Sequence, residues 1–279
     1  MPRAVMTKAD RLREIRKVSR FVRASEAEIR AMEILPRNPR RYPFDIVGLA
    51  VASKAFALSK ACLKLLNSDM SDEAFALSRS IVECANNLRY LTEKPETQTK
   101  RVRCFVNQHK ADKAYWAHYC LELFGGRPEE KEIREYMQRE GITPDTKPAS
   151  RHWSGERGFI WEVMTIDHPL DGPVTTKHKK ISYAADYFQT STFVHCSLPA
   201  IDNHAVDEAQ PFQVSTSSGL HETSQSTLFI VLLYLHSAIS YALFGMNLDR
   251  PPKLEPLFQK TLNLMQPVPR RYDSVKHRP

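Results

Sequence analysis

Apolar residues recur at every third or fourth position along most of the chain, and the strict alternation typical of strands is scarce. In the first such stretch, Leu12, Ile15, Val18 and Val22 are separated by Arg and Lys, which predicts an amphipathic basic helix over about residues 7–34. The same period predicts further helices at about 44–67, 71–93, 96–124, 128–141, 155–164, 177–196, 224–246 and 251–265. We therefore expect an all-α fold, a helical bundle of about six to eight helices with a basic N-terminal helix.

Proline and small polar residues mark the boundaries between these segments. A Pro-rich stretch ends the basic helix, and Ser71, followed by two acidic residues, is the expected N-cap of the helix at 71–93. Residues 197–221 are rich in Ser, Pro and Asn and are expected to be irregular. We divide the chain into a basic helix with a Pro-rich hinge (1–43), a helical bundle domain (44–246), and a short helix with a basic tail (247–279).

The stretch at 227–246 has no formally charged residue and is long enough to cross a bilayer. Its polar residues, among them His236, Ser237 and Ser240, would be costly in hydrocarbon. We interpret the stretch as a buried helix of the bundle and do not expect a membrane partner, although a membrane span is the alternative.

Charge is distributed unevenly along the chain, whose formal net charge is +8. Residues 1–41 carry a net +7 and residues 250–279 a net +5, whereas the segment between them carries a net −4. Basic segments attract polyanions at long range, so the N-terminal helix and the C-terminal tail are expected to bind nucleic acid, an anionic lipid surface or an acidic partner. A solvated helix face and a loose tail without a partner are the simpler alternative.

Composition argues against several classes of protein. The chain has only 9 glycines, too few for the Gly-rich phosphate loops of nucleotide-binding α/β folds. Its 5 cysteines are widely spaced without a Cys-x-x-Cys pair, and its 10 histidines form no ligand-spaced set, so we expect no disulfide framework, no metal and no cofactor. Charged residues precede any apolar run at the N-terminus, so we expect a cytoplasmic protein without a signal peptide.

Two of the predicted helices carry polar residues at spacings that amphipathicity does not require. In the helix at 71–93, one stripe contains Arg79, Glu83, Asn86 or Asn87, and Tyr90. In the helix at 177–196, a second stripe repeats at steps of four, with the residues Tyr187, Ser191 and His195.

These two stripes form a candidate catalytic site if the two helices touch. His195 would exchange protons near neutral pH, Glu83 would orient its ring, and Arg79 would hold an anionic substrate or a developing negative charge. Ser191 would be a nucleophile or a hydrogen-bond donor. Asn87, Tyr90 and Tyr187 would contribute to binding. The alternative is a buried hydrogen-bonded network that fixes the register of the helices, with Arg79 and Glu83 as an i,i+4 ion pair.

An aromatic residue followed by small residues marks a further candidate binding segment. Trp153 and Ser154 lie between His152 and Gly155 and can form a turn that caps a pocket. A single Trp is more often an anchor in a hydrophobic core, which is the alternative interpretation.

Together these motifs resemble a bacterial, all-helical family catalogued as a domain of unknown function. The resemblance rests on Arg-Ser-x-x-Glu at 79–83, His-Trp-Ser-Gly at 152–155 and Tyr-x-x-x-Ser-x-x-x-His at 187–195, in this order, over roughly residues 75–197. It implies a helical bundle and brings no established activity.

A more distant similarity is to the helical nucleotide-binding bundles of toxins and phage-defence proteins, called HEPN. The ribonucleases among them carry an Arg followed, after a few residues, by a His, usually assembled across a dimer, which adds a homodimer to the expected partners. Arg103 and His109 have this spacing, but the chain holds about as many such pairs as chance predicts. On a continuous helix the two side chains would also point about 120° apart.

The sequence leaves two functions open. The polar stripes and the basic ends favour an effector of the toxin or defence type that acts on a nucleic-acid or other phosphate-bearing substrate. The alternative is a non-enzymatic interaction or nucleic-acid-binding module that uses the basic N-terminal helix.

Overall fold

A computed structural model of the chain describes residues 8–38, 40–143, 163, 168–170, 186–187, 190, 205–206, 213–214 and 221–265. The helices within these residues are α1 (Lys8–Ala31), α2 (Pro43–Asn67), α3 (Ser71–Thr92), α4 (Pro95–Phe124), α5 (Glu129–Glu140), α10 (His221–Gly245) and α11 (Leu254–Leu264). Two short strands, β1 (Ala205–Val206) and β2 (Gln213–Val214), complete the described elements. The predicted all-α helical bundle is confirmed.

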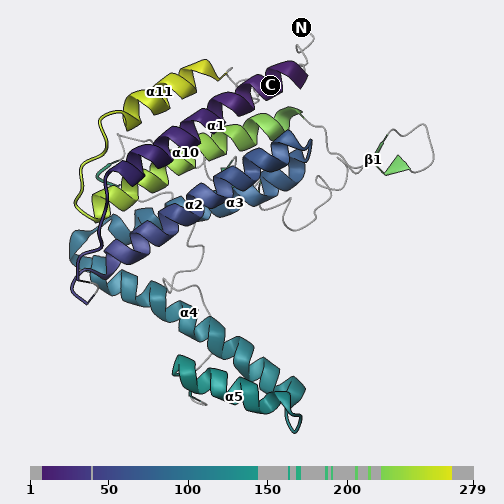
Figure 1. The fold of residues 1–279 in the computed structure, drawn as a ribbon, viewed down its shortest axis with the longest axis vertical. Coiled ribbons are helices and arrows are strands. Elements are labelled where there is room, and N and C mark those ends of the chain that lie inside the picture. The colour runs from purple at the N-terminus through teal and green to yellow at the C-terminus, as the bar shows by residue number, and fades with distance from the viewer. Residues whose placement is uncertain are drawn as a thin grey trace, which may run out of the picture.

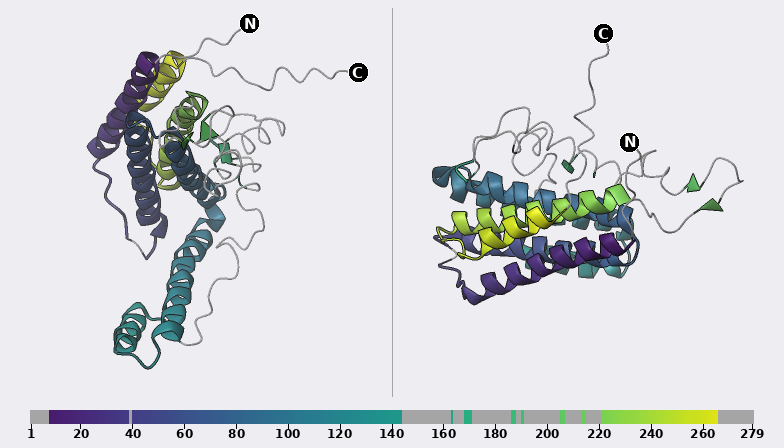
Figure 2. Two further views of the ribbon diagram at one scale, coloured as in Figure 1. Left: turned by 90° about the vertical axis from the view of Figure 1, so that its right-hand side faces the viewer. Right: turned by 90° about the horizontal axis from the view of Figure 1, so that it is seen from above.

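The core of the bundle lies where α10 packs against α2 and α3 (Figure 1). Side chains of α10 such as Leu228, Leu235 and Ile239 are almost completely buried there. Figure 2 shows α1 and α11 on one side of the bundle and α3 on the other, with α2 and α10 between them. Helix α10 is therefore the central helix, which explains why its sequence is apolar on nearly all sides.

Helix α1 is part of this core. Its apolar stripe, Ile15, Val18, Phe21 and Val22, is at most 1% exposed and belongs to the same hydrophobic cluster as α2, α3 and α10. The Phe21 ring also packs against the ring of Phe258 on α11, with the centroids 6.2 Å apart. Burial of this stripe fixes the rotation of α1, so the arginines on the opposite face, Arg16, Arg20 and Arg23, are exposed to solvent.

Several helix ends lie where glycine and proline predicted them. Helix α5 ends at Gly141, whose φ of 65° is the left-handed value that favours glycine. The N-terminus of α3 differs from the expectation: Met70 occupies the N-cap position and Ser71 is the first helical residue. The Ser71 hydroxyl is buried and forms a 2.6 Å hydrogen bond with the Ser224 hydroxyl of α10. The hydroxyl that was expected to cap α3 therefore bonds to another helix.

The predicted irregular structure over 197–221 is wrong in part. Within this range β1 and β2 pair antiparallel, with Ala205 opposite Val214, and α10 begins at His221. Strands of two residues are too short to give an alternating pattern, so the sequence carried no signal for them. Most residues of the helices predicted at 155–164 and 177–196 lie outside the described part of the chain.

Helices α4 and α5 form a hairpin that extends away from the bundle (Figure 1). A small separate cluster of Ala114, Ala117, Met137 and Ile142 holds the two helices together. The outer face of α4 exposes Tyr115, Trp116 and Tyr119. The outer part of the hairpin therefore has its own core, whereas the beginning of α4 packs on α2 and α3.

Two helices meet the length and composition expected of a membrane span. They are Pro43–Asn67 and Thr223–Gly245, whose most apolar windows are 44% and 72% buried inside the bundle. The uncharged stretch at 227–246 lies within the second of them, apart from its last residue. Central helices of soluble bundles have the same character, and α10 occupies such a central place here.

Candidate functional site

The candidate site is built around Arg79 on α3. The Arg79 Nε donates a 3.0 Å hydrogen bond to the Glu83 Oε1, one helical turn further along. Helix geometry alone brings residues at i and i+4 together, so this pair follows directly from the sequence. The Arg79 side chain is 20% exposed and that of Glu83 37%, so the pair lies at the edge of the bundle and is reachable from solvent.

The second partner of Arg79 comes from a distant part of the chain. The Arg79 Nη2 donates a 2.9 Å hydrogen bond to the Tyr187 hydroxyl, and the guanidinium carbon lies 4.9 Å from the centre of the Tyr187 ring. Arg79 and Tyr187, one residue from each polar stripe, are thus in contact. We call Arg79, Glu83 and Tyr187 the Arg79 cluster.

Asp186, next to Tyr187, is a candidate residue that sequence reasoning missed. Its Oδ2 accepts a 2.8 Å hydrogen bond from the Tyr234 hydroxyl of α10. Burial raises the pKa of Asp186 to about 6, and the hydrogen bond from Tyr234 opposes that shift only in part. Burial likewise raises the pKa of Tyr234 well above its ordinary value. Asp186 is the only acidic residue in the helix predicted at 177–196, and that was the signal available in the sequence.

The backbone at residues 186–187 has π-helical geometry. Turns of this kind occur often at functional sites. Here the adjacent side chains have different partners, because Asp186 bonds to α10 and Tyr187 bonds to α3. The turn therefore links the central helix of the bundle to the Arg79 cluster.

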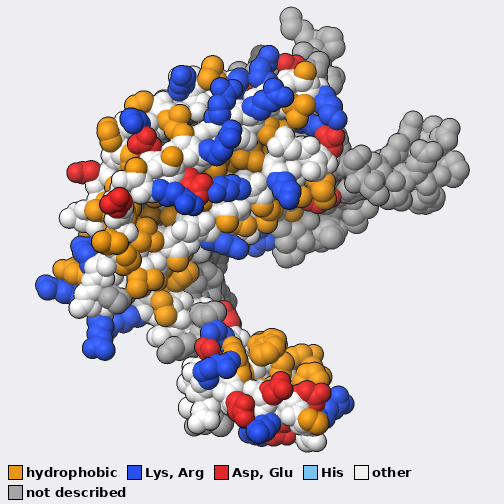
Figure 3. All heavy atoms as spheres, viewed as in Figure 1, with side chains coloured by type: hydrophobic (Ala, Val, Ile, Leu, Met, Phe, Trp, Pro, Cys, Tyr) orange, Lys and Arg blue, Asp and Glu red, His pale blue; other side chains and the backbone are white. Residues whose placement is uncertain are grey.

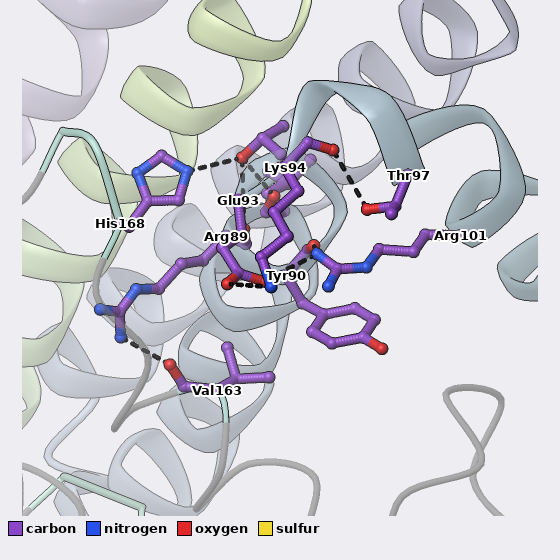
Figure 4. A network of polar contacts seen from close by, with 10 residues as sticks. Arg89, Tyr90, Glu93, Lys94, Thr97, Arg101, Val163 and His168 are labelled. Atoms are coloured by element: carbon purple, nitrogen blue, oxygen red, sulfur yellow. Dashed lines mark hydrogen bonds and ion pairs between the residues drawn. The ribbon is translucent and has the colours of Figure 1, made fainter.

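The rest of the α3 stripe does not join the cluster. The Tyr90 ring lies beneath the Arg101 guanidinium of α4, whose carbon is 3.9 Å from the ring centre, and Arg101 also pairs with Glu93 at 2.9 Å (Figure 4). The Asn86 side chain is buried and donates to the Val82 carbonyl, and the buried Oδ1 of Asn87 has no hydrogen-bond donor among the described residues. Tyr90 thus belongs to the contact between α3 and α4.

A second polar network at the end of α3 was not predicted (Figure 4). The Arg89 Nη1 donates to the Val163 carbonyl at 2.8 Å, and the buried His168 bonds to the Thr92 hydroxyl at 3.1 Å. The Leu170 amide donates to the His168 Nδ1, so the ring hydrogen lies on Nε2 and the ring donates to Thr92. These bonds hold Val163 and His168 against α3. No spacing pattern in the sequence indicated them.

Four of the predicted site residues lie outside the described part of the chain. They are Trp153, Ser154, Ser191 and His195, so the proposed contact of His195 with Glu83 remains a prediction. Arg103 is exposed on α4, and the side chain of His109 is not described. Among the described residues, no group of three or more His, Cys, Asp or Glu side chains is placed to hold a metal ion.

The chemistry open to the Arg79 cluster follows from these contacts. A guanidinium held from two sides has few accessible rotamers, so it can bind an anion with little further loss of entropy. The Glu83 carboxylate accepts from Arg79 and is solvent-accessible, which suits it to orient a neighbouring base. The cluster can therefore bind an anion and position a proton carrier supplied by another residue.

Comparison with known proteins gives one match. No curated protein and no solved structure matches the chain. Residues 45–212 match the family of unknown function DUF5677, a range that holds α2 without its first two residues, α3 to α5, the Arg79 cluster and Asp186. Because this range is more than half of the 279 residues, the chain belongs to the family of unknown function DUF5677.

Proposed function

We propose that the protein is an effector of the toxin or defence type that acts on a nucleic-acid or other phosphate-bearing substrate at the Arg79 cluster. One observation carries the proposal: the Arg79 guanidinium is fixed between the Glu83 carboxylate and the Tyr187 hydroxyl at the edge of the bundle. Guanidinium groups match the geometry of phosphate oxygens and stay charged at every physiological pH.

The remaining roles fall to residues that follow Tyr187. In the helix predicted at 177–196, Ser191 and His195 stand at i+4 and i+8 from Tyr187 and so share its face. His195 would act as general acid or base, with its ring oriented by Glu83, and Ser191 would act as a nucleophile or hydrogen-bond donor. Arg79 would hold the phosphate.

The proposal is tested by expressing Arg79→Ala and His195→Ala and following growth inhibition and the integrity of cellular RNA and DNA. Both variants should lose the effect of the wild-type protein while their unfolding free energies stay within about 2 kcal/mol of it. Arg134→Ala is the matched control, because Arg134 forms the same kind of i,i+4 pair with Glu130 on the distant α5. Unchanged activity in His195→Ala contradicts the proposal, and unfolding of Arg79→Ala would favour a structural network.

A non-enzymatic module that binds through the basic helix is the second candidate. It is favoured by the arrangement of arginines on α1, which is developed below. Because Ile15, Val18, Phe21 and Val22 belong to the core, deleting α1 would unfold the bundle and cannot test this function. Substitutions on the exposed face of α1 are the suitable experiment.

A further inference from the structure

We propose that Arg16, Arg20 and Arg23, the α1 arginine row, form a docking surface for the sugar–phosphate backbone of double-helical nucleic acid. The three residues stand at i, i+4 and i+7, so they share one face of the helix. All three are exposed, because the opposite face of α1 is buried in the core. The inference deepens the second candidate function, binding through α1, by naming its partner, and it concerns a different surface from the Arg79 cluster.

The row differs from the other arginines of α1 in its partners. Arg11 pairs with Asp69, Arg13 with Asp10, and Arg30 with Glu26. Among the described residues, no acidic side chain pairs with a member of the row. Arg20 and Arg23 make only long hydrogen bonds, 3.4 Å from Nε to backbone carbonyls of their own helix. The positive charge of the row is therefore not compensated locally.

The acidic residues of α1 are directed elsewhere. Glu14 is buried, Glu26 also binds Lys60 of α2, and Glu28 binds Lys253 near α11. At 100° per residue, all of them lie outside the arc that holds the row. Figure 3 shows Lys and Arg side chains gathered along the course of α1. The arc of the helix that holds Arg16, Arg20 and Arg23 thus carries positive charge without an acidic side chain.

The type of residue on this face favours a phosphate backbone over other anionic partners. A lipid surface is bound by helices that insert apolar side chains, and α1 has none among the large exposed hydrophobic residues. The centre of a protein–protein interface is mostly apolar and rich in aromatic residues, and this face exposes no large apolar side chain. Single strands are bound by stacking on aromatic rings, but the one aromatic residue of α1, Phe21, is buried.

The length of the row also suits a duplex. From Arg16 to Arg23 the helix rises by roughly 10 Å, at about 1.5 Å per residue. Successive phosphates of one duplex strand advance by about 3.4 Å along the axis, so the row is about as long as three phosphate-to-phosphate spacings. Arginine forks can donate two hydrogen bonds to each phosphate. Such contacts position a duplex without reading its bases, so binding should be independent of sequence.

The row and the Arg79 cluster lie on different sides of the bundle. Helix α1 packs on α2, α10 and α11, whereas α3 packs on α2, α4 and the opposite side of α10 (Figure 2). A duplex on α1 therefore does not contact Arg79. Arg79→Ala should leave duplex binding unchanged, so failure of one proposal can be distinguished from failure of the other.

The test compares the wild type with the triple variant Arg16→Gln, Arg20→Gln, Arg23→Gln by fluorescence anisotropy. The probes are a 20-base-pair DNA duplex and an RNA duplex of the same sequence, titrated between 50 and 300 mM salt. The triple variant should bind about tenfold or more weakly, and the slope of log K against log salt should fall in magnitude by about 3 for DNA, since each lost phosphate contact removes about 0.9. The two duplexes show whether B-form or A-form geometry is preferred.

The control variant removes the same charge elsewhere, with Lys54→Gln, Lys100→Gln and Arg103→Gln on α2 and α4. All six residues are exposed in helices, and Gln keeps the helix propensity, so both variants should fold, which circular dichroism checks. Equal losses of duplex affinity in the two triple variants would show that only the total charge of the protein matters, and would overturn the proposal. Two further results would also overturn it: no binding of either duplex by the wild type, or row-dependent binding only to anionic lipid vesicles.

Discussion

The Arg79 Nη2 lies 2.9 Å from the hydroxyl oxygen of Tyr187, a residue 108 positions further along the chain. This hydrogen bond fastens α3 to the segment that contains Asp186, and Asp186 in turn bonds to Tyr234 of α10. Arg79 is therefore oriented by two different elements of the fold. Removing the Tyr187 hydroxyl is the mildest way to test whether this orientation matters.

Tyr187→Phe should lower the unfolding free energy by about 1.5 kcal/mol, the lower end of the range for a hydrogen bond with one charged partner, because the Arg79 side chain is partly exposed. The ring stays in place, so its contact with the guanidinium is kept. Urea denaturation measures the change. Tyr119→Phe is the control, because Tyr119 is exposed on α4 and should show no effect. Equal stability of wild type and Tyr187→Phe would mean that the bond contributes nothing in solution.

Asp186 should make the protein less stable as pH rises through the mildly acidic range. Its pKa in the folded state, about 6, lies above the value of about 3.9 expected in the unfolded chain. The folded state therefore favours the protonated form, and the associated stability is complete below about pH 4 and lost as pH rises through 6. Urea denaturation of wild type and Asp186→Asn between pH 4 and 8 measures this effect. The unfolding free energy of the wild type, relative to that of Asp186→Asn, should decline up to about pH 6.5 and stay constant above. A flat difference would place Asp186 in a solvated environment.

Asp45 should have the opposite pH dependence. It is buried and accepts hydrogen bonds from the Arg37 backbone amide, Nε and Nη2, at 3.0, 2.8 and 2.8 Å. The bond from the Arg37 side chain, opposed by burial, lowers the pKa of Asp45. Its contribution to stability is therefore present above about pH 4, the unfolded pKa, and is lost as pH falls through the folded pKa.

Asp45→Asn should destabilise the protein at pH 7 by about 2 kcal/mol, because charged hydrogen bonds are replaced by weaker ones. The difference from wild type should shrink below pH 4. Asp10→Asn is the control, since the pair of Asp10 with Arg13 is largely exposed and should contribute less than about 1 kcal/mol. Similar losses of unfolding free energy in both variants would contradict the conclusion that burial makes the Asp45 pair stronger than the Asp10 pair.

Gly245, the last residue of α10, packs closely against Phe44 of α2 and Thr92 of α3. A Cβ at this position would lie 2.3 Å from the Phe44 Cε1 and 2.4 Å from the Thr92 Cγ2. Gly245→Ala should therefore cost about 1 to 3 kcal/mol through overpacking. At Gly48 a Cβ would meet only the Phe44 ring, at 2.8 Å, so Gly48→Ala should cost less. Thermal denaturation of both variants tests this order, and the reverse order would contradict the packing at Gly245.

The bounds of the helices were largely predictable from the sequence. The predicted helices at 44–67 and 96–124 correspond to α2 and α4 with a difference of one residue at their starts, because proline and glycine mark their ends. The pair of Arg79 and Glu83 was predictable for a related reason. The spacing of residues on a helix is fixed by its backbone, whatever surrounds it.

Contacts between distant segments were decided by tertiary structure. Sequence placed Tyr90 on the same stripe as Arg79, yet the rotation of α3 and the course of α4 direct Tyr90 to Arg101. The partners of His168, Asp186 and Ser71 lie between 48 and 153 residues away in the chain. No local pattern encodes such pairs, because they depend on how the buried faces of several helices fit together at once.

The arginine row on α1 shows how the two levels combine. The spacing of Arg16, Arg20 and Arg23, and the basic character of the helix, are properties of the sequence alone. The fold decided which basic side chains of α1 lack an acidic partner. Packing against α2 and α11 brings Lys60 to Glu26 and Lys253 to Glu28. The sequence by itself determined which residues share a helix face, whereas the tertiary structure alone decided which faces meet and which face solvent, because burial of the core sets the rotation of every helix.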